Sequence, residues 1–596
     1  MTVSTAYAFF EALGEAGITH CFVNLGSDHP AMMEAMAKAV REKTNRFPRV
    51  ITCPHEMVAL SMADGYARVT NKPQCVIVHV DVGTQNLGAA VHNASVGRAP
   101  VLIFAGLSPY TTHGEYRGSR TEYIHWLQDV HDQKAIVAQY CRYTAEIKRG
   151  ANVKEMVNRA LSFAQSDPKG PVYVYGSREA LEEDIKSYEL NQTFWTPVQP
   201  AALDSEQCQY IAGLLVNAAQ PLVVTGYSGR NHSAVEGLVT LANKIRGLRV
   251  LETGGCDMCF PSDHPGAQGL HMSGHPCIES ADLILVIDCD VPWVPTAYQP
   301  SASATIIHLD SDPLKVQMPV FYINAVARYR VDVAIALRQI NETIGMSTTW
   351  VDQLRSSIYK ERWENLEKEQ QERWSIAMTK AAVEPNGSYN TAFLARVLKD
   401  SCPAKTTWVV EAVTNAMTVH EQVAPKRPGS WINCGGGGLG WSGGGALGVK
   451  LALEYTEANS KQASFVCQIV GDGTYMFSVP GSVYWIAQRY SIPVLTIVLN
   501  NKGWNAPRHS MLLVHPEGEG TAATNEELNI SFATTPDYAG IAKAASGGKC
   551  FTGIANTAED LHRLLPEAIA AVQSGRVAVI DARIGGSEGK YQPEDI

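Results

Sequence analysis

The sequence predicts an α/β protein made of three doubly wound parallel-sheet domains in series. Strand-like apolar runs fall into three groups along its 596 residues, and helix-length segments separate the runs within each group. This alternation is typical of parallel sheets that are covered by helices on both faces. The chain is also too long for one hydrophobic core, because a domain usually has about 100–150 residues. The expected ranges are 1–188 (first domain), 200–345 (middle domain), 346–385 (linker helix) and 386–596 (last domain).

The apolar runs, taken in order, give the expected strands. They lie at 75–80, 101–105 and 172–175 in the first domain, at 221–225, 282–288 and 305–309 in the middle domain, and at 407–410, 465–470, 494–499 and 577–582 in the last domain. Residues 1–20 alternate apolar and polar side chains at helical spacing. The Pro- and Gln-containing stretch 189–200 is expected to be a linker, and the charged stretch 351–380 a solvent-exposed helix between domains.

Composition excludes several classes of partner. A formal net charge of −10 without a basic stripe argues against nucleic acid. No apolar run approaches the length of a membrane span, and the first residues lack the basic start and apolar block of a secretory signal. The 13 cysteines suit reduced, buried side chains, and Cys256 and Cys259 have no second pair to complete a zinc site. We therefore expect a cytoplasmic enzyme.

The most informative segment lies between residues 465 and 501. An apolar run ends on Gly471-Asp472-Gly473-Thr474, a helix is expected over 479–490, and the next strand ends on Asn500-Asn501. In a parallel sheet both turns lie at the carboxyl edge, where α/β proteins bind ligands. Carboxylate and amide oxygens suit Mg²⁺, which keeps other coordination positions for water and phosphate oxygens. The segment therefore predicts a diphosphate held through a metal ion, although each turn alone would also suit an ordinary strand end.

This segment resembles the thiamin-diphosphate motif, Gly-Asp-Gly followed by Asn-Asn, with a gap that is a residue or two longer than usual. The resemblance implies that Asp472 and Asn501 bind Mg²⁺ with side-chain oxygens and that Gly503 adds its carbonyl oxygen. It also implies cofactor contacts from the turn and from the residue after Gly503, that is, from Gly471, Gly473, Thr474 and Trp504. Trp504, Arg508 and His509 are further candidates for lining a substrate pocket, or else for a surface lid.

Glu56 begins a helical stretch whose other residues are mostly apolar. A carboxylate at this position is usually only a favourable helix start, because the helix dipole attracts negative charge there. The stretch, however, resembles the pyrimidine-binding domain of thiamin-diphosphate enzymes, in which a Glu contacts the aminopyrimidine ring. By that resemblance Glu56 shares a proton with the ring and stabilises the tautomer that activates the cofactor.

Two turns of the first domain resemble those of benzoylformate decarboxylases, which place a Ser and a His over the thiazolium ring. The turns are 24–27 and 79–86. Ser27 and His79 match these positions, so His79 is expected to transfer a proton or to orient the substrate carboxylate, and Asn86 to contact the cofactor. A His in an apolar strand can also be a simple core residue. Weaker candidates are Asp28, His29 and His113.

Nine glycines lie between Cys434 and Gly448. The run could be a flexible linker, but close backbone approach to a ligand explains it better. It resembles the Gly-Leu-Gly loop of the same family, in which a bulky apolar residue bends the cofactor into a V. Leu439 matches that residue and follows Gly438, a predicted cofactor contact. Thr414 and Asn415 match a turn whose side chains donate hydrogen bonds to the diphosphate.

The resemblance spans nearly the whole chain and follows the domain order of the decarboxylase and acetohydroxyacid synthase group. It implies thiamin diphosphate and Mg²⁺ as cofactors, decarboxylation of a 2-oxo acid, and carboligation of the resulting acyl anion as an additional outcome. In that family the carboxylate and the metal site of one cofactor come from different subunits, so a homodimer is the expected minimum and a homotetramer the expected assembly.

Two alternatives stay open. The first is a carboligase like acetolactate synthase, with or without a structural FAD, because residues 269–274 faintly resemble a flavin-side loop. The basic and acidic residues that follow in that branch are absent from 288–296, which argues against FAD. The second alternative is a homologue that binds thiamin diphosphate without turnover.

Overall fold

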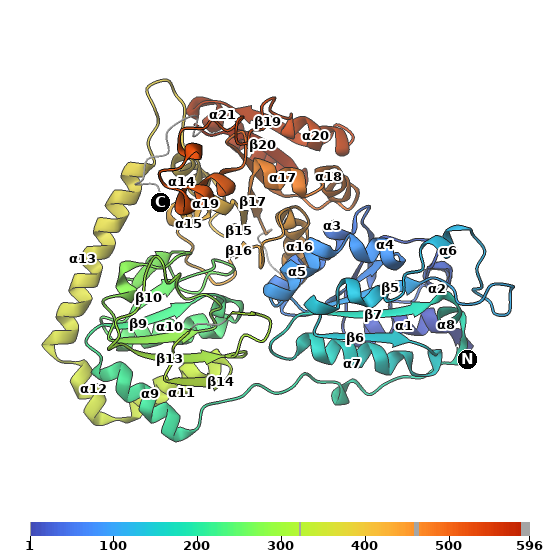
Figure 1. The fold of residues 1–596 in the computed structure, drawn as a ribbon, viewed down its shortest axis with the longest axis horizontal. Helices are drawn as coiled ribbons and strands as arrows, with labels where there is room; N and C mark the ends of the chain where they lie inside the picture. The colour runs from blue at the N-terminus through green and yellow to red at the C-terminus, as the bar shows by residue number, and fades with distance from the viewer. Residues whose placement is uncertain (1, 321–322, 458–463, 586–596) are drawn as a thin grey trace.

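The computed structural model describes residues 2–320, 323–457 and 464–585, and it consists of three α/β domains in series (Figure 1). Each domain contains a six-stranded sheet, and all strand pairs in these three sheets are parallel. The structure therefore confirms the predicted fold class. Each of the ranges 1–188, 200–345 and 386–596 contains one of the sheets, and residues 586–596 lie outside the described part.

The first sheet has the strand order β3-β2-β4-β5-β7-β6. Its strands are β2 (His20–Val23), β3 (Arg49–Thr52), β4 (Gln74–Val78), β5 (Val101–Leu107), β6 (Tyr143–Ile147) and β7 (Pro171–Ser177). The helices are α1 (Thr5–Glu15), α2 (Pro30–Glu42), α3 (Glu56–Thr70), α4 (Val80–Gln85), α5 (Gly88–Val96), α6 (Ile124–Leu127), α7 (Val153–Gln165) and α8 (Arg178–Glu182). A short antiparallel pair, β1 (Thr2–Ser4) with β8 (Asp184–Lys186), joins the two ends of the domain. The helical pattern expected over 1–20 is thus shorter, because β1 precedes α1 and His20 already begins β2.

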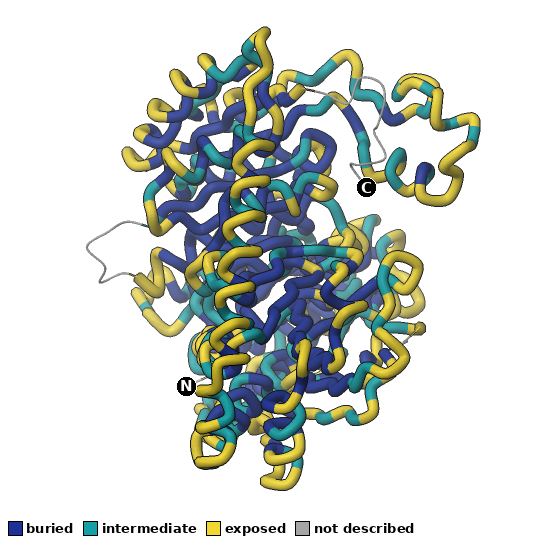
Figure 2. The backbone as a smooth tube through the Cα atoms, turned by 90° about the vertical axis from the view of Figure 1, so that its left-hand side faces the viewer, coloured by how far each residue is buried: buried dark blue, intermediate teal, exposed yellow. Residues whose placement is uncertain are grey.

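The middle sheet has the order β11-β10-β9-β12-β13-β14. Its strands are β9 (Pro221–Thr225), β10 (Arg249–Glu252), β11 (Ala267–Leu270), β12 (Leu283–Ile287), β13 (Thr305–Asp310) and β14 (Ala327–Arg330), and its helices are α9 (Ser205–Asn217), α10 (His232–Lys244) and α11 (Val333–Met346). The connection to the last domain consists of α12 (Thr348–Leu354) and the 24-residue helix α13 (Ser357–Lys380). Most of α13 is exposed at the front of Figure 2, as the charged sequence predicts.

The last sheet has the order β16-β15-β17-β18-β20-β19. Its strands are β15 (Thr407–Glu411), β16 (Trp431–Asn433), β17 (Val466–Gly471), β18 (Leu495–Asn500), β19 (Phe551–Ala555) and β20 (Ala578–Arg583). The helices are α14 (Thr391–Ser401), α15 (Ala416–Val423), α16 (Trp441–Thr456), α17 (Asp472–Phe477), α18 (Pro480–Arg489), α19 (Asn505–Val514), α20 (Tyr538–Ala545) and α21 (Ala558–Gln573).

The crossover between β17 and β18 differs from the single helix predicted over 479–490. It consists of two helices, α17 and α18, and Val479 between them has a positive φ of 55°. Pro480 begins α18, because proline lacks the N–H that a helix interior requires but fits the first helical position. Asp472 is consequently the first residue of α17 and directly follows the end of β17.

Helices α3 and α16 join the first domain to the last domain through closely spaced glycines. A methyl group at Gly65 of α3 would overlap the carbonyl oxygen of Gly445, and one at Gly448 would overlap the carbonyl oxygen of Met62. Both helices are almost entirely buried. Small residues therefore let two backbones approach each other here, which is a structural use of the glycine run that the sequence did not suggest. No helix in the described stretches is long and apolar enough to cross a membrane.

Candidate active site

The predicted site residues lie where parallel strands of the first and last sheets end. Residues 24–29 follow β2, His79 follows β4, Asp472 follows β17 and Asn501 follows β18. The connections begin at the carboxyl edge of each sheet, which is the edge where α/β proteins bind ligands. The parallel topology is therefore what brings these side chains into two groups, one in each of the two domains.

Glu56 is held by two amides in the first domain. Its side chain is buried at the start of α3, with 6% of the residue exposed. The Nδ2 of Asn24 donates to Oε1 at 2.8 Å, and the Nδ2 of Asn86 donates to Oε2 at 3.1 Å. The structure thus brings Glu56 and Asn86, both predicted cofactor contacts, into one hydrogen-bonded group with Asn24. Each carboxylate oxygen has a fixed direction and keeps lone pairs that can accept a further hydrogen bond from a ligand nitrogen.

His79 forms a short hydrogen bond with a buried carboxylate. Its Nδ1 lies 2.5 Å from the Oδ1 of Asp28, and the same oxygen lies 2.9 Å from the Nδ1 of His29. Burial opposes charge on the imidazole, but the hydrogen bond and charge of Asp28 prevail and raise the pKa of His79. Burial would likewise raise the pKa of Asp28, yet His29 and His79 hold it well below its usual range. Asp28 and His29, weaker candidates in the sequence, thus belong to the site.

Ser27 contacts a histidine that sequence reasoning missed. The Nε2 of His125, on α6, lies 3.2 Å from the Oγ of Ser27 and 3.2 Å from the Nη1 of Arg178. His113, which the sequence suggested instead, is exposed to solvent over 87% of its side chain. His125 belongs to no motif and is 98 residues from Ser27 in the chain, so only the folded structure reveals the contact.

Asp472, Asn501 and Gly503 converge in the last domain. If the Asn501 amide were turned by 180°, its NH₂ group would lie 3.1 and 3.2 Å from the carboxylate oxygens of Asp472 and 3.0 Å from the carbonyl oxygen of Gly503. In the present orientation of the Asn501 side chain, the amide oxygen occupies the position that the NH₂ group would take after turning. The oxygens of Asp472, Asn501 and Gly503 therefore face one another without a proton between them. Turning the amide would also let its oxygen accept from the Nδ2 of Asn505 at 2.6 Å, whereas a cation would hold the three oxygens in their present places. Three such oxygens are ligands that Mg²⁺ prefers. The predicted metal-binding residues therefore fit a hard cation.

The surroundings of this group also position Trp504. A methyl group at Gly473 would overlap the Trp504 ring, which packs at 5.8 Å from Phe477 and 4.9 Å from Phe532 between ring centres. Thr474 is buried one turn into α17. Arg508 donates to the Oδ1 of Asn525 at 3.0 Å and so ties α19 to the following loop. Gly471, Gly473, Thr474 and Trp504 thus lie together around Asp472.

The glycine loop before α16 contacts the first domain. The Nδ2 of Asn93 on α5 donates to the carbonyl oxygen of Gly438 at 2.7 Å, and the N–H of Gly438 donates back to Asn93 at 2.9 Å. The carboxylate of Glu411 accepts hydrogen bonds from the N–H groups of Gly440 and Ser442 at the start of α16, while burial raises its pKa to about 7. The backbone of Gly438 is therefore bonded to Asn93 of α5, and its predicted contact with the cofactor stays a prediction.

Leu439 lines a cavity at the junction of the three domains. The cavity has a volume of about 440 Å³ and is also lined by Glu411, Arg98 and Tyr227. Thr414 is exposed near its rim, and Asn415 accepts a hydrogen bond from Thr391 at 2.9 Å. The bulky side chain of Leu439 therefore faces an open space, as a residue that supports a bound ligand requires. The bond to Thr391 uses only the Oδ1 of Asn415, so the predicted donation from its Nδ2 to a phosphate stays a prediction.

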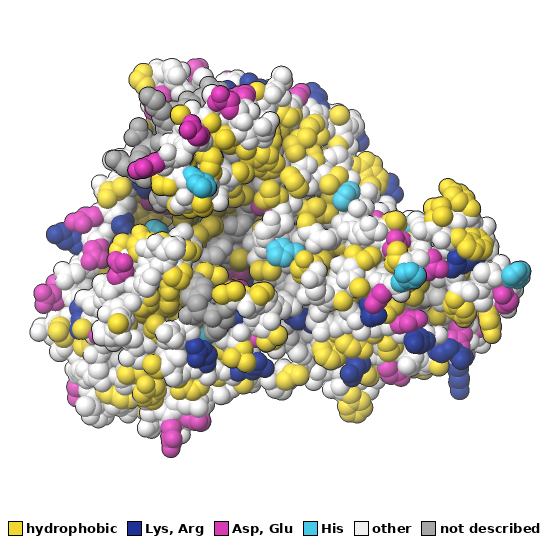
Figure 3. Space-filling model, viewed as in Figure 1, with side chains coloured by type: hydrophobic (Ala, Val, Ile, Leu, Met, Phe, Trp, Pro, Cys, Tyr) yellow, Lys and Arg dark blue, Asp and Glu magenta, His cyan; other side chains and the backbone are white. Residues whose placement is uncertain are grey.

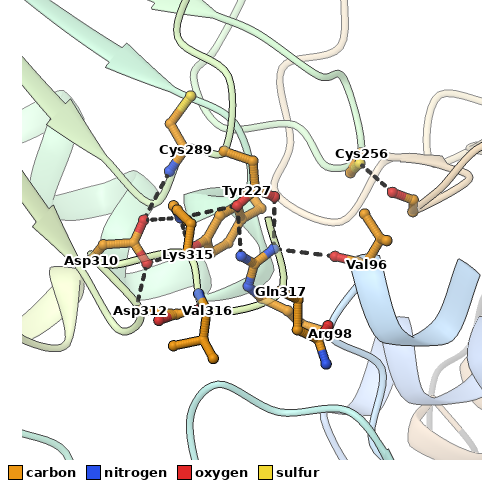
Figure 4. Close-up of polar contacts among 12 residues, drawn as sticks. Val96, Arg98, Tyr227, Cys256, Cys289, Asp310, Asp312, Lys315, Val316 and Gln317 are labelled. Atoms are coloured by element: carbon orange, nitrogen blue, oxygen red, sulfur yellow. Dashed lines mark hydrogen bonds and ion pairs between the residues drawn. The ribbon is translucent and has the colours of Figure 1, made fainter. Parts of the chain in front are cut away.

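An ion-pair network borders this cavity on the side of the middle domain (Figure 4). Arg98 of the first domain pairs with Asp290 through two hydrogen bonds of 3.0 and 2.7 Å, and its guanidinium stacks 3.7 Å above the Tyr227 ring. Lys315 pairs with Asp290 at 3.0 Å and with Asp310 at 2.5 Å. Ion pairs thus connect the carboxyl ends of β12 and β13 to Arg98 of the first domain.

The two groups of site residues are separate within one chain. Across the described ranges, no hydrogen bond or ion pair joins the Glu56 group to the Asp472 group. The first group offers a fixed carboxylate and a proton-carrying imidazole, and the second offers oxygens for a cation. Together these donor sets fit thiamin diphosphate, which has an aminopyrimidine ring at one end and a diphosphate at the other.

Family models of thiamine pyrophosphate enzymes match three successive parts of the chain. The N-terminal TPP binding domain matches residues 3–136, the central domain 208–337 and the C-terminal TPP binding domain 411–582. These matches cover well over half of the chain and follow the order of its three sheets.

Among curated proteins, 2-hydroxyacyl-CoA lyase 2 of Caenorhabditis elegans is 24% identical over 585 residues, which cover 91% of this chain and 84% of that protein. Benzoylformate decarboxylase of Pseudomonas aeruginosa is 22% identical over 84% of this chain and 86% of its own length. Acetolactate synthase of Bacillus subtilis is 26% identical over 50% of each chain. The chain is thus similar to enzymes with three different reactions.

Solved structures share the whole fold. The thiamine diphosphate-dependent 4-hydroxybenzoylformate decarboxylase of Rhodococcus jostii RHA1 superposes with a TM-score of 0.76 at 22% identity, over 98% of this chain and 100% of that one. Benzoylformate decarboxylase of Polynucleobacter necessarius gives a TM-score of 0.76 at 18% identity, over 99% and 100%.

Proposed function

This chain belongs to the thiamin-diphosphate enzymes, and on that premise we propose that it uses thiamin diphosphate and Mg²⁺ to decarboxylate a 2-oxo acid, with carboligation to a second carbonyl compound as an additional outcome. The observation that carries the proposal is that the first domain holds both the His79–Asp28 pair and a carboxylate, Glu56, fixed by Asn24. One group can carry a proton and the other can recognise the cofactor. Decarboxylation followed by protonation of the product requires both.

The residues that would hold the cofactor come from both domains. Glu56 would accept a hydrogen bond from the aminopyrimidine ring, while Asp472, Asn501 and Gly503 would hold Mg²⁺ against the diphosphate. Residues beside these ligands would contact the cofactor directly, namely Asn86, Thr414, Asn415, Gly438, Leu439, Gly471, Gly473, Thr474 and Trp504. When bound, thiamin diphosphate supplies the carbon nucleophile that attacks the carbonyl group of a 2-oxo acid.

His79 would move the proton. Because its Nδ1 is bonded to Asp28, Nε2 is the ring atom that would exchange a proton with the substrate. Asp28 keeps the imidazole oriented and favours its protonated form. The hydroxyl of Ser27 would orient the carboxylate of the substrate, and His125 holds that hydroxyl at 3.2 Å.

Two apolar surfaces support an assembly of at least two copies. Hydrophobic side chains gather on the last domain and near α6 (Figure 3). Phe477 is 53% exposed five residues after Asp472, and Tyr123 and Leu127 are 78% and 71% exposed around His125. We propose that a second copy covers these surfaces and joins the Glu56 group of one chain to the Asp472 group of the other. A homotetramer and a cytoplasmic location stay predictions from the sequence.

A second candidate is a carboligase like acetolactate synthase. The similarity to the Bacillus subtilis enzyme and the cavity beside Arg98 and Tyr227 favour it. A structural FAD belongs to this candidate, and visible flavin absorbance in the purified protein would support it. Tight cofactor binding with no carbon–carbon chemistry on any substrate would instead support a homologue that binds thiamin diphosphate without turnover.

Product analysis tests the proposal. The protein is incubated with thiamin diphosphate and Mg²⁺ and with pyruvate, benzoylformate or a 2-hydroxyacyl-CoA thioester. We expect an aldehyde and CO₂ from a 2-oxo acid, and no product when either cofactor is omitted. Acetolactate or another acyloin as the main product would favour the second candidate. Cleavage of the thioester alone would contradict the decarboxylase and place the chain with the lyases.

A further inference from the structure

Arg178 is a buried cation that lacks a carboxylate partner. It follows β7 directly and is 8% exposed. Its Nη1 contacts only neutral groups, the hydroxyl of Thr121 at 3.2 Å and the ring of His125 at 3.2 Å, and its Nε is buried without a hydrogen bond. No ion pair with a carboxylate is formed within the residues that the structure describes. A buried arginine normally has such a partner, because a charge that is removed from water is stabilised mainly by an opposite charge.

The neighbouring carboxylates are engaged elsewhere. Glu182 pairs with Arg117 at 3.1 Å, and Glu179 accepts hydrogen bonds from the backbone and hydroxyl of Thr111 at 2.9 and 2.6 Å. The imidazole of His125 cannot supply negative charge either, and burial, aided by the charge of Arg178, lowers its pKa. None of these side chains forms an ion pair with Arg178, so its guanidinium can bind an anion from outside them.

Arg178 lies next to the residues assigned to substrate binding. The contact chain runs from the Oγ of Ser27 to the Nε2 of His125 and on to the Nη1 of Arg178, with 3.2 Å at each step. Strands β2, β4 and β7 are parallel members of one sheet, so Ser27, His79 and Arg178 all follow the same edge. The unpaired guanidinium is thus one side chain away from the group that would orient the substrate.

We propose that Arg178 binds a second carboxylate of the substrate, so that the natural substrate is a 2-oxo acid with a carboxylate at its far end. The inference rests on the proposed decarboxylase function and names its substrate class. A guanidinium matches a carboxylate through two parallel hydrogen bonds, and a buried pair of this kind is stronger than one in water.

The departing carboxylate does not suit this role. It loses its negative charge as CO₂ forms, so a cation bound to it would stabilise the ground state more than the transition state and slow the reaction. A carboxylate at the far end keeps its charge throughout. Its ion pair with Arg178 would hold the substrate in one orientation, and oriented binding of this kind accelerates the chemical step.

Paired substrates test the proposal on the holoenzyme. We compare kcat/KM for 2-oxoglutarate with 2-oxopentanoate, and for 2-oxoadipate with 2-oxohexanoate, since the members of each pair differ by a terminal carboxylate in place of a methyl group. We expect the wild type to favour a dicarboxylic member by about 10- to 100-fold, as lost charged hydrogen bonds of about 1.5–3 kcal/mol imply. Arg178→Gln should abolish the preference while changing the monocarboxylic substrates little, and Arg178→Lys should retain part of it.

Arg249 offers a matched control. It is also 8% exposed, its guanidinium donates to the hydroxyl of Ser280 and the carbonyl oxygen of Gln220, and it lies at the start of a strand rather than the end. Arg249→Gln should therefore keep the preference. Equal kcat/KM within each pair for the wild type, or an equal loss on both members in Arg178→Gln, would overturn the proposal. Dissociation of the assembly in Arg178→Gln would assign the counter-ion to a second copy and also overturn it.

A binding measurement separates this proposal from the proposed function. If the holoenzyme decarboxylates no 2-oxo acid, the decarboxylase is contradicted, and glutarate then serves as a probe for the anion site. We expect glutarate, but not butyrate, to raise the Tm of the wild type and of Arg249→Gln, and to leave that of Arg178→Gln unchanged. No shift of the wild type with glutarate would overturn the inference, including in the case that Arg178→Gln fails to fold.

Discussion

The site residues of the first domain and those of the last domain satisfy their polar groups in different ways. In the first domain two amides donate to Glu56, and Asp28 has two imidazole partners. In the last domain the oxygens of Asp472, Asn501 and Gly503 face one another with no proton between them. The members of the first group are hydrogen-bonded to one another and shift one another's pKa values, whereas the facing oxygens of the second group fit a cation.

The pKa values of Asp28 in the first domain and Asp472 in the last domain are shifted in opposite directions. His29 and His79 keep Asp28 ionised by holding its pKa below the usual range, although the residue is only 1% exposed. Burial raises the pKa of Asp472 to about 6, because only backbone N–H groups oppose it. A metal ion would supply the positive charge that Asp28 already receives from histidines.

The largest expected effect comes from Glu56→Gln. The amide keeps the shape of the side chain but cannot share a proton with the cofactor, so the decarboxylation rate should fall by about 10²- to 10⁴-fold. Affinity for thiamin diphosphate and Mg²⁺ should change little, which titration of the cofactor by protein fluorescence would measure. An active Glu56→Gln enzyme would remove Glu56 from the proposed chemistry.

Asp472→Asn should act on binding. Replacing a charged metal ligand should weaken the apparent affinity for Mg²⁺ and cofactor by about 100-fold or more, since losing groups that merely support a ligand already costs about 10–100-fold. Activity should therefore recover in part at saturating Mg²⁺, unlike that of Glu56→Gln. Asp560→Asn is the control, because Asp560 forms the capping box at the start of α21 and its replacement should lower the Tm with little effect on metal affinity. Unchanged Mg²⁺ dependence in Asp472→Asn would contradict the metal site.

Asp28→Asn should shift the pH dependence. Since the pKa of His79 is raised above 6.5, stabilisation by the Asp28 pair is fully present below pH 6.5 and is lost as the pH rises through the higher folded value. In the variant burial dominates, so the basic limb of the kcat/KM profile should move to lower pH, with activity near neutrality reduced by about 10-fold. The exposed His113 provides the control His113→Asn, which should leave the profile in place. An unshifted basic limb in Asp28→Asn would show that His79 does not carry the proton.

Gly65→Ala should have the smallest effect on the reaction rate and should lower the free energy of unfolding instead. Its methyl group would overlap the carbonyl oxygen of Gly445, so the contact between α3 and α16 should lose about 1–3 kcal/mol of unfolding free energy. Gly88 has no atom near the position of an added methyl group, so Gly88→Ala should not destabilise the protein. Thermal unfolding of both variants measures the difference, and equal Tm values would contradict the packing.

Much of the site could be predicted because it follows strand ends. Asp472, Asn501, Glu56 and His79 each follow a strand or begin a helix, and a parallel sheet brings such positions to one edge. These residues are close in sequence to the element that positions them. Local pattern and topology suggested Asp472 and Asn501, whereas Glu56 and His79 were assigned through the resemblance to thiamin-diphosphate enzymes.

The contacts between distant segments could not be predicted in this way. His125 meets Ser27 across 98 residues, and Asn93 meets Gly438 across 345. No local pattern distinguishes His125 from the exposed His113. The glycine run suggested a bound ligand. Glycines in a sequence indicate that the backbone has a close neighbour, but they do not show whether this neighbour is a ligand or another helix.

Edge strands were missed for a related reason. The residues of β14 alternate between half-buried and exposed positions and include two arginines, so the strand lacks the apolar run that marks the central strands. The helix predicted over 479–490 corresponds to α18 (Pro480–Arg489), whereas the short helix α17 before it was missed, because its six residues show no clear helical pattern in the sequence.

Mixing two inactive variants tests most directly the claim that the two groups complete one site across two chains. Glu56→Gln and Asp472→Asn are co-expressed with different tags, and the mixed dimers are assayed at limiting Mg²⁺. If each site joins Glu56 of one chain to Asp472 of the other, a mixed dimer has one intact site of two, and mixed dimers purified through both tags should regain about half of wild-type activity. Activity no higher than the mean of the two variants alone would contradict the shared site.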